Sequence, residues 1–172
     1  MKLARTISLD ESDANVFPRP SAAGEWAVTG TFAFADCDPA QMDGKNQIAF
    51  RDGWLGTESF GRSTFVQVAT IAAEQYEETV RRVAAHLFQD YGAPNMLAAL
   101  DAARHEIDDM ANLCRHPVGT LLAIEREFTE AGIAERARAI TGSEDRSHPR
   151  IWSLVEDEPG QEEPHDDGLS AD

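Results

Sequence analysis

The sequence predicts an α+β fold, with a mainly antiparallel sheet of about five strands packed against an antiparallel helix pair. Segments with strand-like patterns lie before and after two consecutive segments with helical periodicity. The chain has 172 residues, which suits one domain and is long enough to bury a core. Its end is rich in charge and Pro. We therefore expect a single domain over residues 1–155 and a disordered acidic tail over 156–172.

Alternation and residue type predict the strands of the first part. Residues 3–9 place Leu, Arg, Ile and Leu at every second position, which indicates a half-buried strand. Residues 25–35 are rich in Thr, Val and aromatic residues and predict a second strand, in which Gly30 indicates a bulge or a close backbone approach. Residues 47–55 fit either a short helix or an irregular crossing. A third strand is expected over residues 63–71.

The middle of the chain predicts two amphipathic helices. Apolar residues between 76 and 91 recur at spacings of three and four, with charged residues on the other face. Gly92 is suited to end this helix, and Pro94 is suited to the first position of the next one. The second apolar stripe covers residues 96–114. We expect the two helices to form an antiparallel hairpin across the sheet.

The last part of the domain returns to strands. Residues 120–128 begin as an apolar run and end in alternation, which predicts a fourth strand. Residues 132–140 fit a short helix or a further strand of the sheet. Residues 143–150 indicate a loop, and residues 151–155 predict the last strand.

The charge of the chain disfavours some classes of partner, although a local patch of Arg is compatible with it. The formal net charge is −16, and eight acidic residues lie after residue 155 in a stretch without Lys or Arg. The rest is mildly acidic, which disfavours binding to nucleic acid or to an anionic membrane. The sequence has neither the apolar core of a signal peptide nor a run of about 18 apolar residues. We therefore expect a cytoplasmic protein that binds no nucleic acid and no membrane.

Two cysteines and a histidine are weak candidates for a metal site. Cys37, Cys114 and His116, with Asp36 and Asp38, supply enough S, N and O donors for zinc. The Cys-x-His spacing is, however, unusual for a zinc knuckle. The ordinary alternative is that Cys114 packs in a helix stripe and that His116 caps the helix end. The acidic neighbours of Cys37 also disfavour a nucleophilic role. We expect no metal and no cofactor.

Residues 36–62 form the candidate functional region. The stretch is rich in Gly, aromatic and charged residues, and it is too long for a simple hairpin turn. It matches neither the phosphate-binding loop nor the dinucleotide-binding fingerprint, and the chain has no Gly-x-Ser-x-Gly nucleophile elbow. A purely structural alternative is a tight crossing, in which at least one of Gly53, Gly56 and Gly61 has positive φ and the other two tolerate Ala.

Three segments resemble a small, uncharacterised family of proteobacterial proteins of about this length. They are residues 24–32 (GEWAVTGTF), 50–61 (FRDGWLGTESFG) and 116–122 (HPVGTLL). The resemblance brings no established activity and no catalytic residue. It implies an association with gene groups that mature molybdopterin-dependent oxidoreductases and include a ligase-like biotin/lipoate protein. An accessory role in that maturation is therefore expected from the resemblance.

The favoured hypothesis is a non-catalytic accessory or interaction protein with a protein partner. It follows from the lack of a catalytic constellation in a chain with a well-specified fold. The contact surface is then the stretch 36–62, and Trp54 and Phe60 are its anchors. Aromatic and Arg side chains contribute most to the energy of protein interfaces, which is why these two residues are singled out.

The alternative hypothesis is a small-molecule-binding domain or an enzyme that uses the same stretch. Arg51 and Arg62 would hold an anionic group of the ligand. Asp52 or Glu58 would serve as the acid or base. A pull-down from the native host tests the first hypothesis, and a thermal-shift screen with nucleotides, acyl donors and organic acids tests the second.

Overall fold

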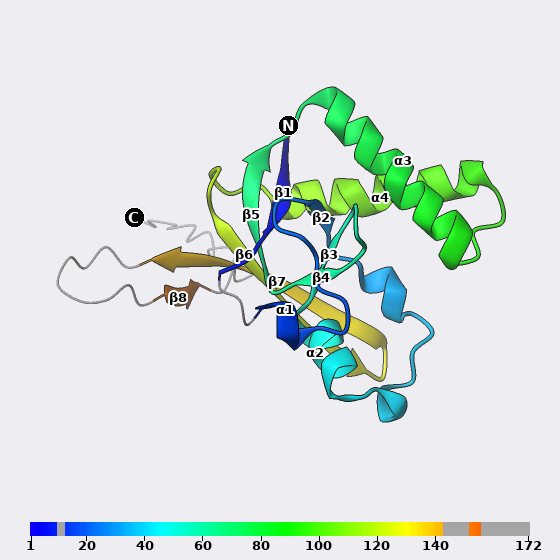
Figure 1. Cartoon of the computed structure of the whole chain (residues 1–172), viewed down its shortest axis with the longest axis horizontal. Helices are drawn as coiled ribbons and strands as arrows, with labels where there is room; N and C mark the ends of the chain where they lie inside the picture. The colour runs from blue at the N-terminus through cyan, green and yellow to red at the C-terminus, as the bar shows by residue number, and fades with distance from the viewer. Residues whose placement is uncertain (10–12, 143–151, 156–172) are drawn as a thin grey trace, which may run out of the picture.

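The computed structural model describes residues 1–9, 13–142 and 152–155. Its described strands form one antiparallel sheet of eight strands, in the order β4-β3-β2-β1-β5-β6-β7-β8 (Figure 1). The strands are β1 (Lys2–Ile7), β2 (Trp26–Val28), β3 (Trp54–Gly56), β4 (Arg62–Ser63), β5 (Phe65–Thr70), β6 (Leu121–Thr129), β7 (Gly132–Gly142) and β8 (Trp152–Val155). The fold class is α+β, as predicted, but the prediction of about five strands was wrong.

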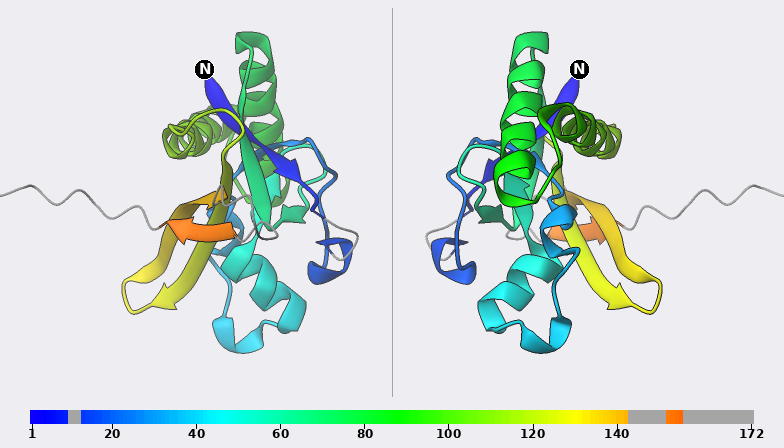
Figure 2. Two further views of the ribbon diagram at one scale, coloured as in Figure 1. Left: turned by 90° about the vertical axis from the view of Figure 1, so that its left-hand side faces the viewer. Right: turned by 90° about the vertical axis from the view of Figure 1, so that its right-hand side faces the viewer.

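The helical elements lie in two groups. They are α1 (Asp13–Val16), the 3-10 turns η1 (Thr31–Phe34) and η2 (Pro39–Gln41), α2 (Gly44–Asp52), α3 (Ala73–Asp90) and α4 (Met96–Leu113). The long helices α3 and α4 form an oblique hairpin, and α4 packs against β1 and β2. Figure 2 shows α2 (cyan) at the other end of the molecule, beside the β6–β7 hairpin (yellow). The sheet thus carries two separate helical layers.

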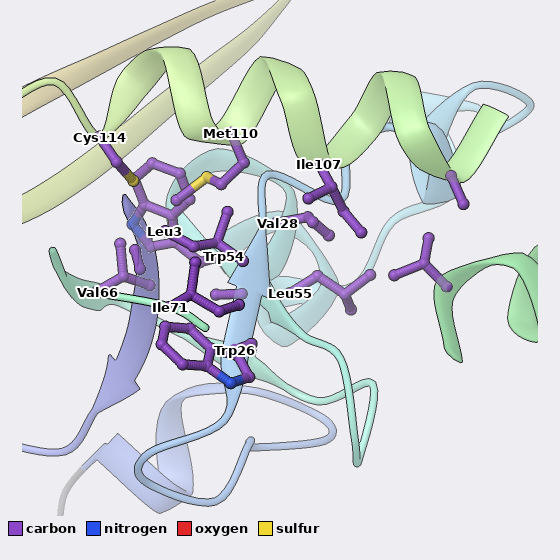
Figure 3. Close-up of a cluster of buried hydrophobic side chains, with 14 of the residues drawn as sticks. Leu3, Trp26, Val28, Trp54, Leu55, Val66, Ile71, Ile107, Met110 and Cys114 are labelled. Atoms are coloured by element: carbon purple, nitrogen blue, oxygen red, sulfur yellow. The ribbon is translucent and has the colours of Figure 1, made fainter. Parts of the chain in front are cut away.

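The main core lies between the sheet and α4 (Figure 3). Leu3, Trp54, Val66 and Ile107 are each 0% exposed in it. Because the Trp54 side chain is completely enclosed, it cannot act as an exposed anchor for a partner. The prediction of Trp54 as a contact residue was therefore wrong, and this residue serves packing.

A second, smaller core lies under α2. It contains Phe17, Phe34, Ala49 and Phe50, all buried. The ring of Phe50 stacks on Phe128 of β6, with 4.0 Å between the ring centroids and 9° between the planes. This aromatic pair fixes α2 on the far end of β6, away from the α3–α4 hairpin.

Several strands and helices match the sequence-based expectations. β1, β5 and β6 lie where strands were expected, and β8 lies within the expected last strand. The ambiguous segment 132–140 is strand β7, paired along its length with β6. Gly92 has φ of +72° directly after the last residues of α3, as its role in ending the helix requires.

Other expectations differ from the structure. The second strand ends at Val28, because Gly30 adopts φ of +71° and the chain turns into η1. A Cβ at Gly30 would lie 2.4 Å from Leu55 Cβ, so the expected close approach is real. The ambiguous segment 47–55 contains the end of α2 and the start of β3. Pro94 is not the first helical residue, because Asn95 caps α4 by accepting a hydrogen bond from the Ala98 amide.

Two expectations fall on residues that the structure does not describe. The loop predicted over 143–150 and the acidic tail predicted over 156–172 both lie outside the described ranges. Within those ranges, none of the helices combines the length and the apolar character that crossing a membrane requires.

Candidate functional site

The carboxylate of Glu25 holds the loop between β3 and β4. Glu25 is 2% exposed. Its Oε1 accepts hydrogen bonds from the Glu58 amide at 2.9 Å and the Ser59 amide at 2.5 Å. Its Oε2 accepts from the Ala22 amide and the Ser59 hydroxyl, both at 2.7 Å. The Gly-rich stretch therefore does surround an anion, and that anion belongs to the protein itself.

The glycines of this stretch are needed for space rather than for positive φ. None of Gly53, Gly56 and Gly61 has positive φ, so that prediction was wrong. At each of them an added Cβ would approach closer than real Cβ atoms do, so all three resist Ala. The nearest atom is Ala49 O at 2.7 Å for Gly53, the Glu25 carboxyl carbon at 2.9 Å for Gly56 and Pro20 O at 2.3 Å for Gly61.

Phe60 takes the left-handed conformation in this loop. Its φ is +54°, which costs a bulky residue on the order of 1 kcal/mol. The half-buried ring stacks on His86 of α3, with 3.7 Å between the centroids and 10° between the planes. His86 Nδ1 lies 2.9 Å from the Asp90 carboxylate. Burial lowers the pKa of His86, and Asp90 opposes this effect. The imidazole is therefore mainly neutral at pH 7.

Arg62 is a buried arginine. It is 8% exposed, and its guanidinium lies over the Phe34 ring, 4.6 Å from the centroid. Burial lowers its pKa to about 9, and the nearby charge of Arg126 acts in the same direction. Its hydrogen bonds run to the carbonyl oxygens of Gly53 (3.1 Å), Gly30 (3.1 Å) and Thr29 (3.4 Å). Among the described residues, no carboxylate lies within 4.0 Å of this guanidinium.

Arg126 is a second buried arginine, which the sequence analysis missed. Its side chain is 0% exposed and lies 3.1 Å from Glu135. Nε donates to the Thr31 hydroxyl, Nη1 to the Phe50 and Gly53 carbonyls at 2.9 Å, and Nη2 to the Thr29 carbonyl. Arg62 and Arg126 thus share two carbonyl acceptors. Together they fix η1 and the end of α2 against the sheet.

A cavity of about 490 Å³ lies beside Arg62. Its lining includes Arg19, Phe34, Phe60, Arg62 and His86. The backbone brings Arg19 to this place, because the Arg62 amide donates to the Arg19 carbonyl at 2.8 Å. Arg19 is exposed, and its guanidinium has no hydrogen-bond or ion-pair partner within the described ranges. Two arginines thus line one cavity, and neither guanidinium has a carboxylate partner among the described residues.

The other predicted charged residues lie elsewhere. Arg51 and Asp52 are neighbours at the end of α2 and pair with each other at 2.9 Å. Glu58 pairs with Arg82 of α3 at 2.9 Å on the surface. None of these four lines the cavity beside Arg62. The structure therefore does not bring Arg51 and Arg62 together around one ligand.

The weak metal candidates Cys37, Cys114 and His116 do not form a cluster of possible metal ligands. Cys37 is exposed, with Sγ 3.8 Å from the Ala33 carbonyl oxygen. Cys114 is buried at the end of α4, and burial raises the pKa of its thiol to about 12. The carbonyl of His116 accepts a hydrogen bond from Lys2 Nζ at 2.9 Å. In the part of the chain that the structure describes, no three His, Cys, Asp or Glu residues are grouped to hold a metal.

Glu106 of α4 predicts a pH dependence of stability. Burial raises its pKa from 4.5 to about 7, with further contributions from Asp109 and Glu135, while Arg126 opposes the shift. Folding therefore favours the protonated carboxyl. Stability from this group is fully present below about pH 4.5 and is lost as the pH rises through about 7.

Glu106→Gln is expected to raise the thermal midpoint at about pH 8 and to change it little at about pH 4, because the amide mimics the protonated acid. Thermal unfolding followed by circular dichroism at the two pH values measures the effect. Glu74→Gln, an exposed carboxylate on α3, is the matched control. An increase in the thermal midpoint of Glu106→Gln that is the same at both pH values would contradict the raised pKa of Glu106.

These observations define an α+β protein whose antiparallel sheet carries a buried pair of arginines beside an open cavity. Residues 1–150 match the profile of a family of unknown function (DUF6505), and the chain belongs to this family. The match agrees with the resemblance to an uncharacterised family. No curated protein and no solved structure gives a significant match to the chain.

Proposed function

We propose that the protein is a non-catalytic accessory protein that binds a protein partner through the tip of the α3–α4 hairpin. The observation that supports this proposal is a group of large apolar side chains that are exposed at this turn. Their exposed fractions are 44% for Phe88, 45% for Tyr91, 44% for Met96 and 80% for Leu97. Single exposed apolar residues are ordinary, but a concentration of them is typical of interaction surfaces.

The position of this surface supports the proposal. The turn between α3 and α4 lies at the right-hand end of the two helices in Figure 1, away from the sheet. Phe60 lies at the margin of the surface, because His86 contacts both the Phe60 ring and the Tyr91 ring, the latter with 5.1 Å between centroids. The proposed contact surface therefore still includes Phe60 of the stretch 36–62. The exposed side chains of the hairpin tip take over the role that was expected for Trp54.

The partner class is proposed from the resemblance. The segments 24–32, 50–61 and 116–122 resemble proteobacterial proteins associated with the maturation of molybdopterin-dependent oxidoreductases. We propose that the partner is such an oxidoreductase, or a protein that matures it, in the bacterial cytoplasm. A contact surface without a catalytic constellation suits such an accessory role.

Affinity capture from the native host tests this function. Tagged wild-type protein is expected to recover a stoichiometric partner that mass spectrometry assigns to molybdopterin enzyme maturation. Leu97→Glu is expected to lose that partner, because it places a charge in the apolar surface. Val118→Glu is the matched control, since Val118 is also exposed, at 57%, but lies outside the tip. Equal recovery with Leu97→Glu, or no partner in repeated captures, would contradict the proposal.

The alternative function, binding of an anionic ligand, has support only around Arg62. That residue lines a cavity, whereas Arg51 is paired with Asp52. The proposed acid or base, Asp52 or Glu58, is in each case held in an ion pair with an arginine. Neither Asp52 nor Glu58 lines the cavity, so an enzymatic version of this alternative loses the acid or base that the sequence suggested for it.

A further inference from the structure

We propose that the cavity beside Arg62 binds a small organic anion. Its charged group lies between the Arg19 and Arg62 guanidinium groups, and its apolar body lies against Phe34 and Phe60. This inference goes beyond the proposed protein contact, because the two arginines are not part of the hairpin tip. The two sites share Phe60 and Tyr91, but Arg19 lines only the cavity and Leu97 belongs only to the tip, so variants of these two residues test the ligand and the partner separately.

The charge at the cavity is the first argument. The whole chain carries a net charge of −16, so acidic side chains are abundant. Even so, the three side-chain hydrogen bonds of Arg62 run to carbonyl oxygens and not to a carboxylate. A guanidinium has about five N–H groups, so about two of them remain for a further acceptor. Arg19 has no side-chain partner in the described ranges. A carboxylate or phosphate would satisfy both groups.

The backbone holds the two arginines in place before any ligand binds. Pro20 and Arg62 form a parallel β-bridge. The Arg62 amide donates to Arg19 O at 2.8 Å, and the Ser21 amide donates to Arg62 O at 2.9 Å. Gly61 lies so close to Pro20 that no side chain fits between them. The backbone at both arginines is therefore fixed before binding, and among these two the side chain that a ligand still has to order is the exposed one of Arg19.

Part of the remaining lining suits an apolar body, although Gln41 and Asn46 are polar. Phe34, Leu55 and Phe60 supply apolar surface, and the neutral ring of His86 continues it. Phe60 keeps this position in spite of its φ of +54°. The volume of about 490 Å³ lies in the usual range for small-molecule sites, about 300–1,000 Å³. An aromatic carboxylate or aryl phosphate of one ring fits this space.

One acidic residue also lines the cavity, and its carboxylate is engaged. Asp38 Oδ1 accepts a hydrogen bond from the Ala40 amide at 3.0 Å, where it caps η2. The charged lining groups within the described ranges are thus Arg19, Arg62 and Asp38. The lining itself thus carries two positive charges and one negative charge, a balance that favours an anion over a cationic ligand.

Titration with four probes tests the proposal: phenyl phosphate, benzoate, inorganic phosphate and benzyl alcohol. Chemical shifts in two-dimensional NMR spectra of the full chain report binding. We expect saturable binding of at least one of the two aromatic anions, and the stronger of them identifies the charged group. Inorganic phosphate is expected to bind at least about tenfold more weakly, because it lacks the apolar body, and benzyl alcohol is expected not to bind.

Arg19→Ala is the decisive variant, because Arg19 is exposed and its loss should not disturb folding. It is expected to weaken binding of the aromatic anion about tenfold or more, and Arg19→Lys is expected to weaken it less. Arg51→Ala removes the same charge outside the cavity and is expected to leave binding unchanged. Absence of saturable binding by both aromatic anions, equal binding of phenyl and inorganic phosphate, or equal loss in both Ala variants would overturn the proposal. Leu97→Glu should bind the probe normally, whatever the outcome of the capture experiment.

Discussion

Replacing Arg126 with methionine is expected to lower the free energy of unfolding by about 3–5 kcal/mol. Methionine has similar length but no donor, so the buried carbonyls of Thr29, Phe50 and Gly53 lose hydrogen bonds. The Glu135 carboxylate also loses its ion-pair partner. Urea unfolding followed by fluorescence and circular dichroism measures the change.

Two further variants make this result specific. Arg136→Met on β7 removes an arginine with an exposed side chain and is expected to cost less than about 0.5 kcal/mol. Arg126→Lys keeps the charge, but one ammonium cannot replace the planar set of donors that reaches three elements. It should therefore lose most of the same stability. A stable Arg126→Met protein would show that the carbonyls find other donors.

Replacing Glu25 with alanine is the second change with a large expected effect, about 3–4 kcal/mol of unfolding free energy. The carboxylate accepts hydrogen bonds from the amides of Ala22, Glu58 and Ser59 and from the Ser59 hydroxyl. Its removal leaves these part-buried donors without their common acceptor. Denaturation in urea gives the magnitude.

The matched control for Glu25 lies in the same loop. Glu58 is exposed, its side chain pairs with Arg82, and Glu58→Ala is expected to cost less than about 0.5 kcal/mol. Glu25→Gln retains the shape of the side chain but offers an amide NH₂ where an acceptor is needed. Its loss of unfolding free energy should therefore lie between the losses of Glu25→Ala and Glu58→Ala. Equal stabilities of the Glu25→Ala and Glu58→Ala proteins would show that the loop is held by its other contacts.

The sequence was sufficient for the elements that have a long periodic pattern. α3 and α4 repeat their apolar positions over several turns, and β1, β5 and β6 alternate over six or more residues. β3 and β4 span only three and two residues, so no period is established in them. Their pairing comes from tertiary contacts, and the pattern of β7 fitted a helix as well as a strand, which together explain why too few strands were predicted.

The candidate site was less predictable, because its contacts join distant segments. Glu25 is separated by 33 positions from the Glu58 amide that it binds, and nothing beside it in the sequence indicates burial. Trp54 follows a glycine in a polar stretch, a context that resembles an exposed loop, yet it lies in the core. Arg126 did carry a signal. It has the same parity as the buried Leu122 and Ile124 of its strand, and an arginine at an inward position indicates a buried donor.

The place of β1 in the sheet has a consequence for the order of folding. Ala4 pairs with Ala27 of β2 on one side and with Val68 of β5 on the other. The first of these partners follows closely in the chain, whereas the second is synthesised only after α2 and the β3–β4 loop. One edge of the central strand therefore stays unpaired during synthesis and is open to pairing with another chain. Such distant pairing also slows folding, since loop closure must precede the contacts that stabilise it.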